Sequence, residues 1–202
     1  MNDPERGDHR ASLRQQAVLA RFGELALRSD SLDETLTEAC RLVGDALGTD
    51  LAKVMELQAD GTSLSVRAGA GWKPGLVGEV TLKATDASSE GHALKTGEPT
   101  TSPDIATETR FTYPPFLVEN GVKAAANVVI IGGQGRPPFG ILQVDSRTPR
   151  QFTDAETAFM RSYANLSRRR WTACAWSGRC ATGKLAFIWR STRLRWGRGT
   201  WT

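Results

Sequence analysis

Few side chains in residues 1–166 could do chemistry, and their types favour binding over catalysis. His9 and His92 are the only histidines in the sequence, so a metal site built from several histidines cannot form. Cys40 is the only cysteine before Ser167, and it lies on the apolar stripe of an expected helix, which indicates core packing. We therefore expect no catalytic residue, no metal ligand and no enzymatic activity in this chain.

Aromatic side chains in the segment 72–120 give the clearest binding signal. Together with two polar residues on apolar stretches, they could line a pocket that is mostly apolar with a few polar groups. The same rings could instead do no more than pack this segment onto a sheet, and His92 could be a partly exposed structural residue. The candidate ligand-binding residues are Trp72, His92, Phe111, Tyr113, Phe116, Asn127 and Gln143.

The basic character of the chain belongs to its last 36 residues. The sequence has a formal net charge of +4, but residues 1–166 contain 17 Lys and Arg against 22 Asp and Glu. Residues 167–202 contain nine Lys and Arg, no acid, and five of the six tryptophans. Net charge therefore supports a nucleic-acid interpretation for the tail alone, and we expect no specific nucleic-acid partner for the remainder.

The tail at 167–202 shows no periodicity that lasts beyond one helical turn. Its wealth of Trp, Arg, Cys, Gly and Thr is typical of G-rich codons read out of frame. With G- or C-ending codons, a one-base shift after Ser167 converts it into an acid-containing string with helical Val and Leu spacing. We therefore expect a non-native tail, frameshifted or disordered. The alternative is a true basic and aromatic tail for nucleic acid or anionic lipid.

The compartment is expected to be the cytoplasm. No run approaches about 18 apolar residues, so no membrane span is predicted. The first ten residues are polar and charged, unlike the apolar region of a signal peptide. A lone thiol before the tail fits a reducing environment.

The pattern of residues 11–166 predicts an α+β domain preceded by a disordered lead at 1–10. Ser31 and Thr153 each begin a capping box before an apolar helical stripe, and Asp60-Gly61 is a hairpin turn signal. Short turns between strands predict antiparallel pairing, with one sheet face covered by the terminal helices. The expected helices are 11–28, 32–47, 88–95 and one from 154, with a turn or two inside 103–120; the expected strands are 50–58, 63–70, 79–82, 99–102, 123–131 and 139–146.

Three segments together resemble the GAF domain, a sensory module of bacterial signalling proteins. The resemblance spans residues 11–166, and its pieces are specific for the fold mainly through their order and spacing. The segments are GEP at 97–99 with PDIATETRF at 103–111, the strand from Gly121 to Ile131, and PFGILQVDS at 138–146 with RQFTD at 150–154 and Phe159 to Leu166.

This resemblance implies a GAF/PAS-like antiparallel sheet with the N- and C-terminal helices on one face. The other face would carry the variable insert, about residues 72–120, which can enclose a small molecule. Members of the family bind bilins through a cysteine near the pocket, but no cysteine occurs between Asp50 and Leu166. Covalent bilin is therefore not expected, no cofactor is predicted, and the asparagine-lysine-phenylalanine-aspartate-glutamate pattern of cyclic-nucleotide members is missing.

The resemblance implies a non-catalytic sensory domain, the N-terminal part of a sensor histidine kinase, that acts by biasing its terminal helices. Leu13, Val18, Phe22 and Leu25, with Met160, Tyr163 and Leu166, offer apolar stripes for a homodimer. One alternative is the branch of the family that reduces free methionine sulfoxide, which needs reactive cysteines that the insert lacks. Another is nucleic-acid binding through the tail.

Overall fold

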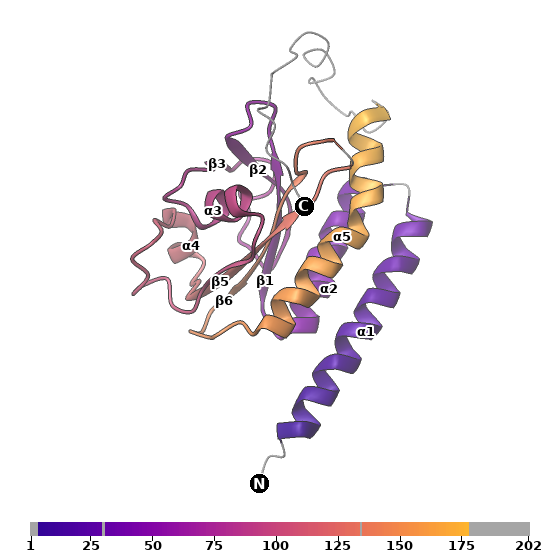
Figure 1. Ribbon diagram of the computed structural model, residues 1–202, viewed down its shortest axis with the longest axis vertical. Coiled ribbons are helices and arrows are strands. Elements are labelled where there is room, and N and C mark those ends of the chain that lie inside the picture. The colour runs from indigo at the N-terminus through magenta and orange to yellow at the C-terminus, as the bar shows by residue number, and fades with distance from the viewer. Residues whose placement is uncertain (1–3, 30, 134, 178–202) are drawn as a thin grey trace.

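An antiparallel sheet of six strands organises the fold. The computed structural model describes residues 4–29, 31–133 and 135–177 (Figure 1). Across the sheet the strands run in the order β3-β2-β1-β6-β5-β4, and each neighbouring pair is antiparallel, as the short turns predicted. The strands are β1 (Leu51–Leu57), β2 (Ser63–Ala70), β3 (Thr81–Lys83), β4 (Thr100–Ser102), β5 (Ala124–Ile130) and β6 (Gly140–Ser146).

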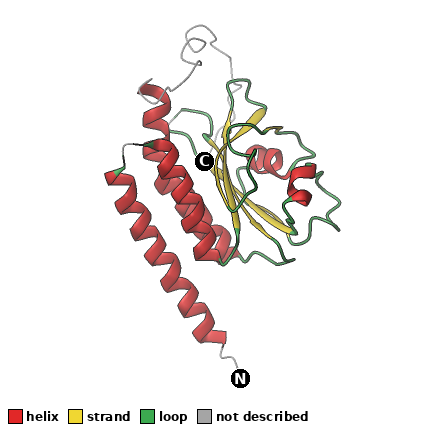
Figure 2. Cartoon of the chain, turned by 180° about the vertical axis from the view of Figure 1, so that it is seen from behind, coloured by secondary structure: helices red, strands yellow, loops and turns green. Residues whose placement is uncertain are grey.

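The helices divide between the two faces of this sheet (Figures 1 and 2). The helices α1 (Pro4–Arg28), α2 (Leu32–Leu47) and α5 (Asp154–Ser177) form a layer on one face, with α2 against β1 and β2 and α5 against β5. The short helices α3 (Ser89–Thr96) and α4 (Pro115–Glu119) lie on the opposite face with their connecting loops. The expected α+β architecture, with terminal helices on one face and the insert on the other, is confirmed.

Local capping chemistry sets the ends of α2 and α5. The Ser31 side chain accepts a hydrogen bond from the Glu34 backbone N–H at 3.2 Å, and Gly48 ends α2 with φ 63°, a conformation that glycine adopts without strain. At α5, Thr153 Oγ1 accepts from the Glu156 N–H, and Glu156 accepts from the Thr153 N–H at 2.9 Å. The second capping box is therefore complete.

Residues 4–10 are helical, which differs from the disordered lead predicted over residues 1–10; residues 1–3 lie outside the described residues. The helix begins at Pro4, where the missing N–H costs nothing because the first turn of a helix has no internal acceptor for it. Polar composition alone suggested disorder, but a polar segment can also be helical.

The core between the helices and the sheet is closed by aromatic rings. The Tyr163 ring lies 4.9 Å from Phe22 and 5.8 Å from Phe159, measured between centroids. Its hydroxyl donates to the Ala39 carbonyl at 3.0 Å, so the buried polar end of the ring is satisfied. Cys40 lies in this same core with no exposed surface.

Much of the apolar stripe predicted for a dimer is used inside the monomer. Phe22, Met160 and Tyr163 are buried, and Val18 and Leu25 pack partly against the core.

A smaller set of leucines on the helical layer is exposed to solvent. Leu13 is 51 % exposed, Leu27 is 83 % exposed and Leu166 is 55 % exposed.

Helix α5 continues past residue 166, the end of the predicted domain, to Ser177. Most of the tail expected to be non-native, residues 178–202, lies outside the described residues. Within the part of the chain that the structure describes, no helix is long and apolar enough to cross a membrane.

Candidate ligand-binding site

Four buried polar side chains form a row across the sheet on the face that α3 and α4 cover. Strand pairing places Lys53 opposite Gln143, Gln143 opposite Asn127, and Asn127 opposite Thr100. Because directly paired residues point to the same face, these side chains run side by side across β1, β6, β5 and β4. None is more than 4 % exposed.

A buried ion pair anchors one end of this row. Lys53 Nζ lies 3.0 Å from Asp145 Oδ2, and neither side chain is exposed. Gln143 Nε2 donates to the other carboxylate oxygen of Asp145 at 2.6 Å. Burial raises the pKa of the Asp145 carboxyl, while the Lys53 charge and these hydrogen bonds act in the opposite direction.

Aromatic rings cover Lys53 on the side away from the sheet. Its Nζ lies 4.3 Å from the Trp72 ring centroid and 5.6 Å from that of Phe116. The Trp72 indole N–H donates to the Ala52 carbonyl at 2.9 Å, which fixes the ring. Gly69, the β2 partner of Lys53, makes room for the indole: a Cβ there would lie 2.9 Å from Trp72 Cδ1.

The N-terminal turn of α3 extends the polar row above the sheet. Asn127 Nδ2 donates to Ser89 Oγ at 3.1 Å, and the Ser89 hydroxyl donates to Glu90 Oε2 at 3.1 Å. Glu90 is 4 % exposed. Burial raises the pKa of its carboxyl, with Lys53 the main opposing charge.

The β4 edge closes the row with a second polar chain. Tyr113 Oη donates to Ser102 Oγ, and the Ser102 hydroxyl donates to Glu108 Oε2 at 2.8 Å. The hydrogen bond from the Arg110 guanidinium lowers the pKa of Glu108 to about 2, so this carboxylate stays ionised. Burial raises the pKa of Tyr113.

Four oxygen atoms in and beside the row have no hydrogen-bond partner although they are buried. They are Thr100 Oγ1, Asn127 Oδ1, Gln143 Oε1 and Glu90 Oε1. Each can accept a hydrogen bond. Buried polar atoms in folded proteins are nearly always paired with protein or water, so four unpaired acceptors around one patch make it a candidate site for a hydrogen-bond donor.

The structure brings five of the seven predicted binding residues to this face. Asn127 and Gln143 lie in the row itself, Trp72 and Phe116 cover Lys53 with their centroids 6.0 Å apart, and Tyr113 lies at the β4 edge.

The other two predicted residues form a pair at α3. His92 is exposed, and its ring lies 5.4 Å from that of the buried Phe111. The Arg110 guanidinium lies over the same Phe111 ring at 4.8 Å.

Sequence reasoning missed Lys53, Asp145 and Glu90, the charged members of the site. A signal was present: Lys53 interrupts the apolar strand LAKVM, and Gln143 and Asp145 alternate with Leu142 and Val144. Alternation of this kind places the polar residues on one face of a strand. It does not reveal that the face is buried, which depends on the insert folding over it.

Comparison with known proteins identifies the family. The model of the GAF domain matches residues 31–168, more than half of the chain. The chain belongs to the GAF domain family. Comparison with curated proteins gives no match.

Solved structures carry the same GAF fold at low sequence identity. The GAF domain of a phosphoenolpyruvate-protein phosphotransferase from Coxiella burnetii has 19 % identity and a TM-score of 0.74, with 83 % of this chain and 98 % of that chain covered. The corresponding domain from Acinetobacter has 20 % identity, a TM-score of 0.70, and coverage of 82 % and 97 %. GAF domains are sensory and regulatory modules in general, and this role extends to the present chain.

A catalytic protein is also among the structures with this fold. Free methionine-R-sulfoxide reductase from Neisseria meningitidis, solved with its substrate, has 15 % identity and a TM-score of 0.68, covering 83 % of this chain and 93 % of that chain. In the present GAF domain, Cys40 packs in the core on the helical side of the sheet, opposite the polar row. Burial raises the pKa of this thiol to about 12.

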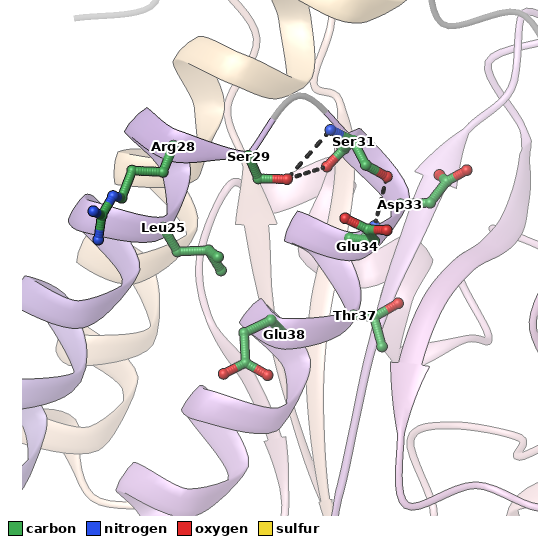
Figure 3. Close-up of a pocket in the computed structure, with 8 residues that line it drawn as sticks. All are labelled: Leu25, Arg28, Ser29, Ser31, Asp33, Glu34, Thr37 and Glu38. Atoms are coloured by element: carbon green, nitrogen blue, oxygen red, sulfur yellow. Dashed lines mark hydrogen bonds between the residues drawn. The ribbon is translucent and has the colours of Figure 1, made fainter.

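An open groove lies between the end of α1 and the start of α2 (Figure 3). Two of its three carboxylates already have partners: Asp33 lies 2.8 Å from Arg67, and Glu38 lies 2.6 Å from Arg41. The groove contains none of the predicted binding residues. It is lined by Leu25, Arg28, Ser29, Ser31, Asp33, Glu34, Thr37 and Glu38.

Proposed function

We propose that this GAF domain is a non-catalytic, cytoplasmic sensory module that binds a small polar molecule between the sheet and the helices α3 and α4. The buried polar row with its four unpaired acceptors is the observation that carries this proposal. A ligand in this position lies against Asn127 and Gln143, beneath Trp72 and Phe116. These residues include most of those expected from the sequence to bind a ligand.

The energetics favour a bound donor over an empty site. A buried acceptor left unpaired costs about 1–3 kcal/mol, so four of them take a large share of the roughly 5–15 kcal/mol by which a domain is stable. A molecule that donates to them removes this cost and stabilises the liganded state. Binding would thus favour one arrangement of α3 and α4 against the sheet.

The strands provide the route from the site to the terminal helices. On β1, Lys53 faces the site while its neighbours Ala52 and Val54 pack in the helical core. On β5, Asn127 faces the site while Val128 packs in the helical core. A ligand that shifts these strands therefore shifts the surface on which α2 and α5 rest.

In this proposal a different domain carries out the signalling response to ligand binding. We place the chain as the N-terminal part of a sensor histidine kinase, with α5 as the element that leads onward, on the strength of the resemblance in residues 97–166. The reductase alternative is disfavoured because the thiol of Cys40 is buried on the far side of the sheet. Nucleic-acid binding through the tail would use residues 167–202, of which 178–202 lie outside the described residues.

A thermal-shift screen of nucleotides, amino acids, amines, tetrapyrroles and small organic acids against the full chain tests the proposal. A ligand should raise the melting temperature, and Thr100→Val should reduce that increase because it removes one acceptor at nearly constant volume. Thr101→Val, the neighbour on the other face of β4, is the matched control. The site is wrongly assigned if no compound of any class raises the melting temperature. It is also wrongly assigned if Thr100→Val leaves the increase in melting temperature unchanged.

A further inference from the structure

The charges of the site do not balance. Lys53 and Asp145 neutralise each other at 3.0 Å. Glu90 is a second buried carboxylate: the neighbouring Ser89 hydroxyl donates to its Oε2, and its Oε1 has no hydrogen-bond partner among the described residues. Lys53 acts on Glu90 through space but is in contact with Asp145. With all three groups ionised, the buried site carries one surplus negative charge.

The hydrogen bonds of the two amide side chains fix which of their atoms are left unpaired. Gln143 must direct its amide nitrogen to Asp145, because a carboxylate only accepts, and this leaves Gln143 Oε1 free. The Ser89 hydroxyl donates its one hydrogen to Glu90, so it can only accept from Asn127. Asn127 therefore donates to Ser89 through its amide nitrogen, and Asn127 Oδ1 is left unpaired. The free atoms of both amides are therefore acceptors.

We infer that the ligand of this site is a small organic cation whose head group carries several N–H donors, an ammonium or a guanidinium. The inference rests on the proposed binding function and names the chemistry of its ligand. Glu90 supplies the counter-charge, and the oxygens of Thr100, Asn127 and Gln143 accept hydrogen bonds from the head group. The rings of Trp72 and Phe116 form an apolar wall that suits a carbon skeleton.

Other ligand classes fit this geometry less well. An anion would meet the surplus negative charge, and the site's own cation, Lys53, is already engaged by Asp145 and the two rings. A neutral amide would satisfy the acceptors but would gain no charge–charge attraction from Glu90, whose ionised form only a cation stabilises. A cation without N–H groups would satisfy the charge but leave the acceptors unpaired.

Calorimetric titration of the full chain with matched compounds separates these classes. Ethylammonium and methylguanidinium carry both charge and donors, tetramethylammonium carries charge alone, acetamide carries donors alone, and propionate is an anion. We expect binding of the first two only, in a constant background of sodium chloride. Binding of tetramethylammonium, or of potassium in place of the amines, would overturn the requirement for N–H donors.

Two variants locate the site. Glu90→Gln keeps the shape of the side chain and removes its charge, so it should weaken binding of the amines at least tenfold while leaving the unliganded protein as stable as the wild type or more so. Glu119→Gln, an exposed glutamate on α4, should change nothing. Amine binding that survives Glu90→Gln with full affinity would refute the inference.

The binding function and the ligand class can fail separately. If a neutral or anionic compound from the thermal screen binds and responds to Thr100→Val, the binding function stands and the cation assignment is wrong. If no compound of any class binds, both the binding function and the cation assignment are wrong.

Discussion

Replacing Lys53 with methionine should destabilise the protein by about 3–5 kcal/mol at pH 8, because it leaves the Asp145 carboxylate buried without its cation. The structure supports a value in this range, since both side chains of the pair are 0 % exposed and the ammonium also lies over two aromatic rings. Methionine keeps most of the volume of the lysine side chain, so the loss of stability is caused by the uncompensated charge of Asp145 more than by a cavity. For a chain of this size it corresponds to a fall in melting temperature of roughly 6–20 °C.

The pH dependence of the Lys53→Met stability loss tests whether the Asp145 charge causes it. Burial raises the pKa of Asp145 above its usual value even with Lys53 present, so the folded state retains this proton to higher pH than the unfolded state does. The contribution of Asp145 to stability is therefore largest below its unfolded pKa and is lost as pH rises through the folded pKa. Without Lys53 the folded pKa moves further up. The difference in stability between wild type and Lys53→Met should thus shrink as pH falls from 8 to 5.

Urea unfolding at several pH values, followed by circular dichroism, is the direct assay. Lys95→Met is the matched control, because Lys95 pairs with Asp86 at the surface, where its loss should change stability by less than about 0.5 kcal/mol. The double variant Lys53→Met with Asp145→Asn should recover most of the loss, since it removes both charges and keeps an acceptor for Gln143. A Lys53→Met deficit that is equal at pH 5 and pH 8, and that the second substitution does not relieve, would refute the electrostatic account.

Three further predictions concern the rest of the chain. Cys40 should react with thiol reagents only as fast as the protein opens, as followed by peptide mass mapping, because its thiol is buried and burial raises its pKa to about 12; labelling at the rate of an exposed thiol would contradict this. Residues Leu13, Leu27 and Leu166 should support a homodimer that Leu13→Ser with Leu166→Ser weakens, measured by sedimentation; a wild-type monomer near millimolar concentration would exclude it. Restoring one base near Ser167 should open a long frame with helix-like sequence; stop codons within a few tens of bases in the other frames would reject this.

The elements that sequence analysis located correctly are those with local causes. Ser31 caps α2 and Thr153 caps α5 through contacts that span three residues. The Asp60 turn is equally local, because its carboxylate accepts from the Thr62 and Ser63 N–H groups at 2.9 and 2.8 Å and so closes the β1–β2 hairpin. Each of these signals can be read within a few residues of the chain.

The charged part of the site could not be read in this way because it is assembled by long-range pairing. Lys53 and Asp145 are 92 residues apart and meet only because β1 pairs with β6. Nothing local distinguishes a lysine that will be buried from one on a solvated strand. The aromatic residues Trp72 and Phe116 were predicted to line a site because large rings suggest a pocket whatever their register.

The two faces of the central strands have different chemistry, and this difference links stability to sensing. Ala52, Val54 and Val128 hold the sheet against α2 and α5 by apolar burial, which tolerates little change in shape. Lys53 and Asn127 alternate with these apolar residues on the same strands and project to the opposite face, where buried acceptors are unpaired. A ligand bound to these acceptors changes the forces on β1 and β5, the strands that also carry α2 and α5. Large-to-small substitutions on the helical side should therefore lower stability more than they lower ligand affinity, whereas Thr100→Val and Glu90→Gln should lower ligand affinity more than they lower stability.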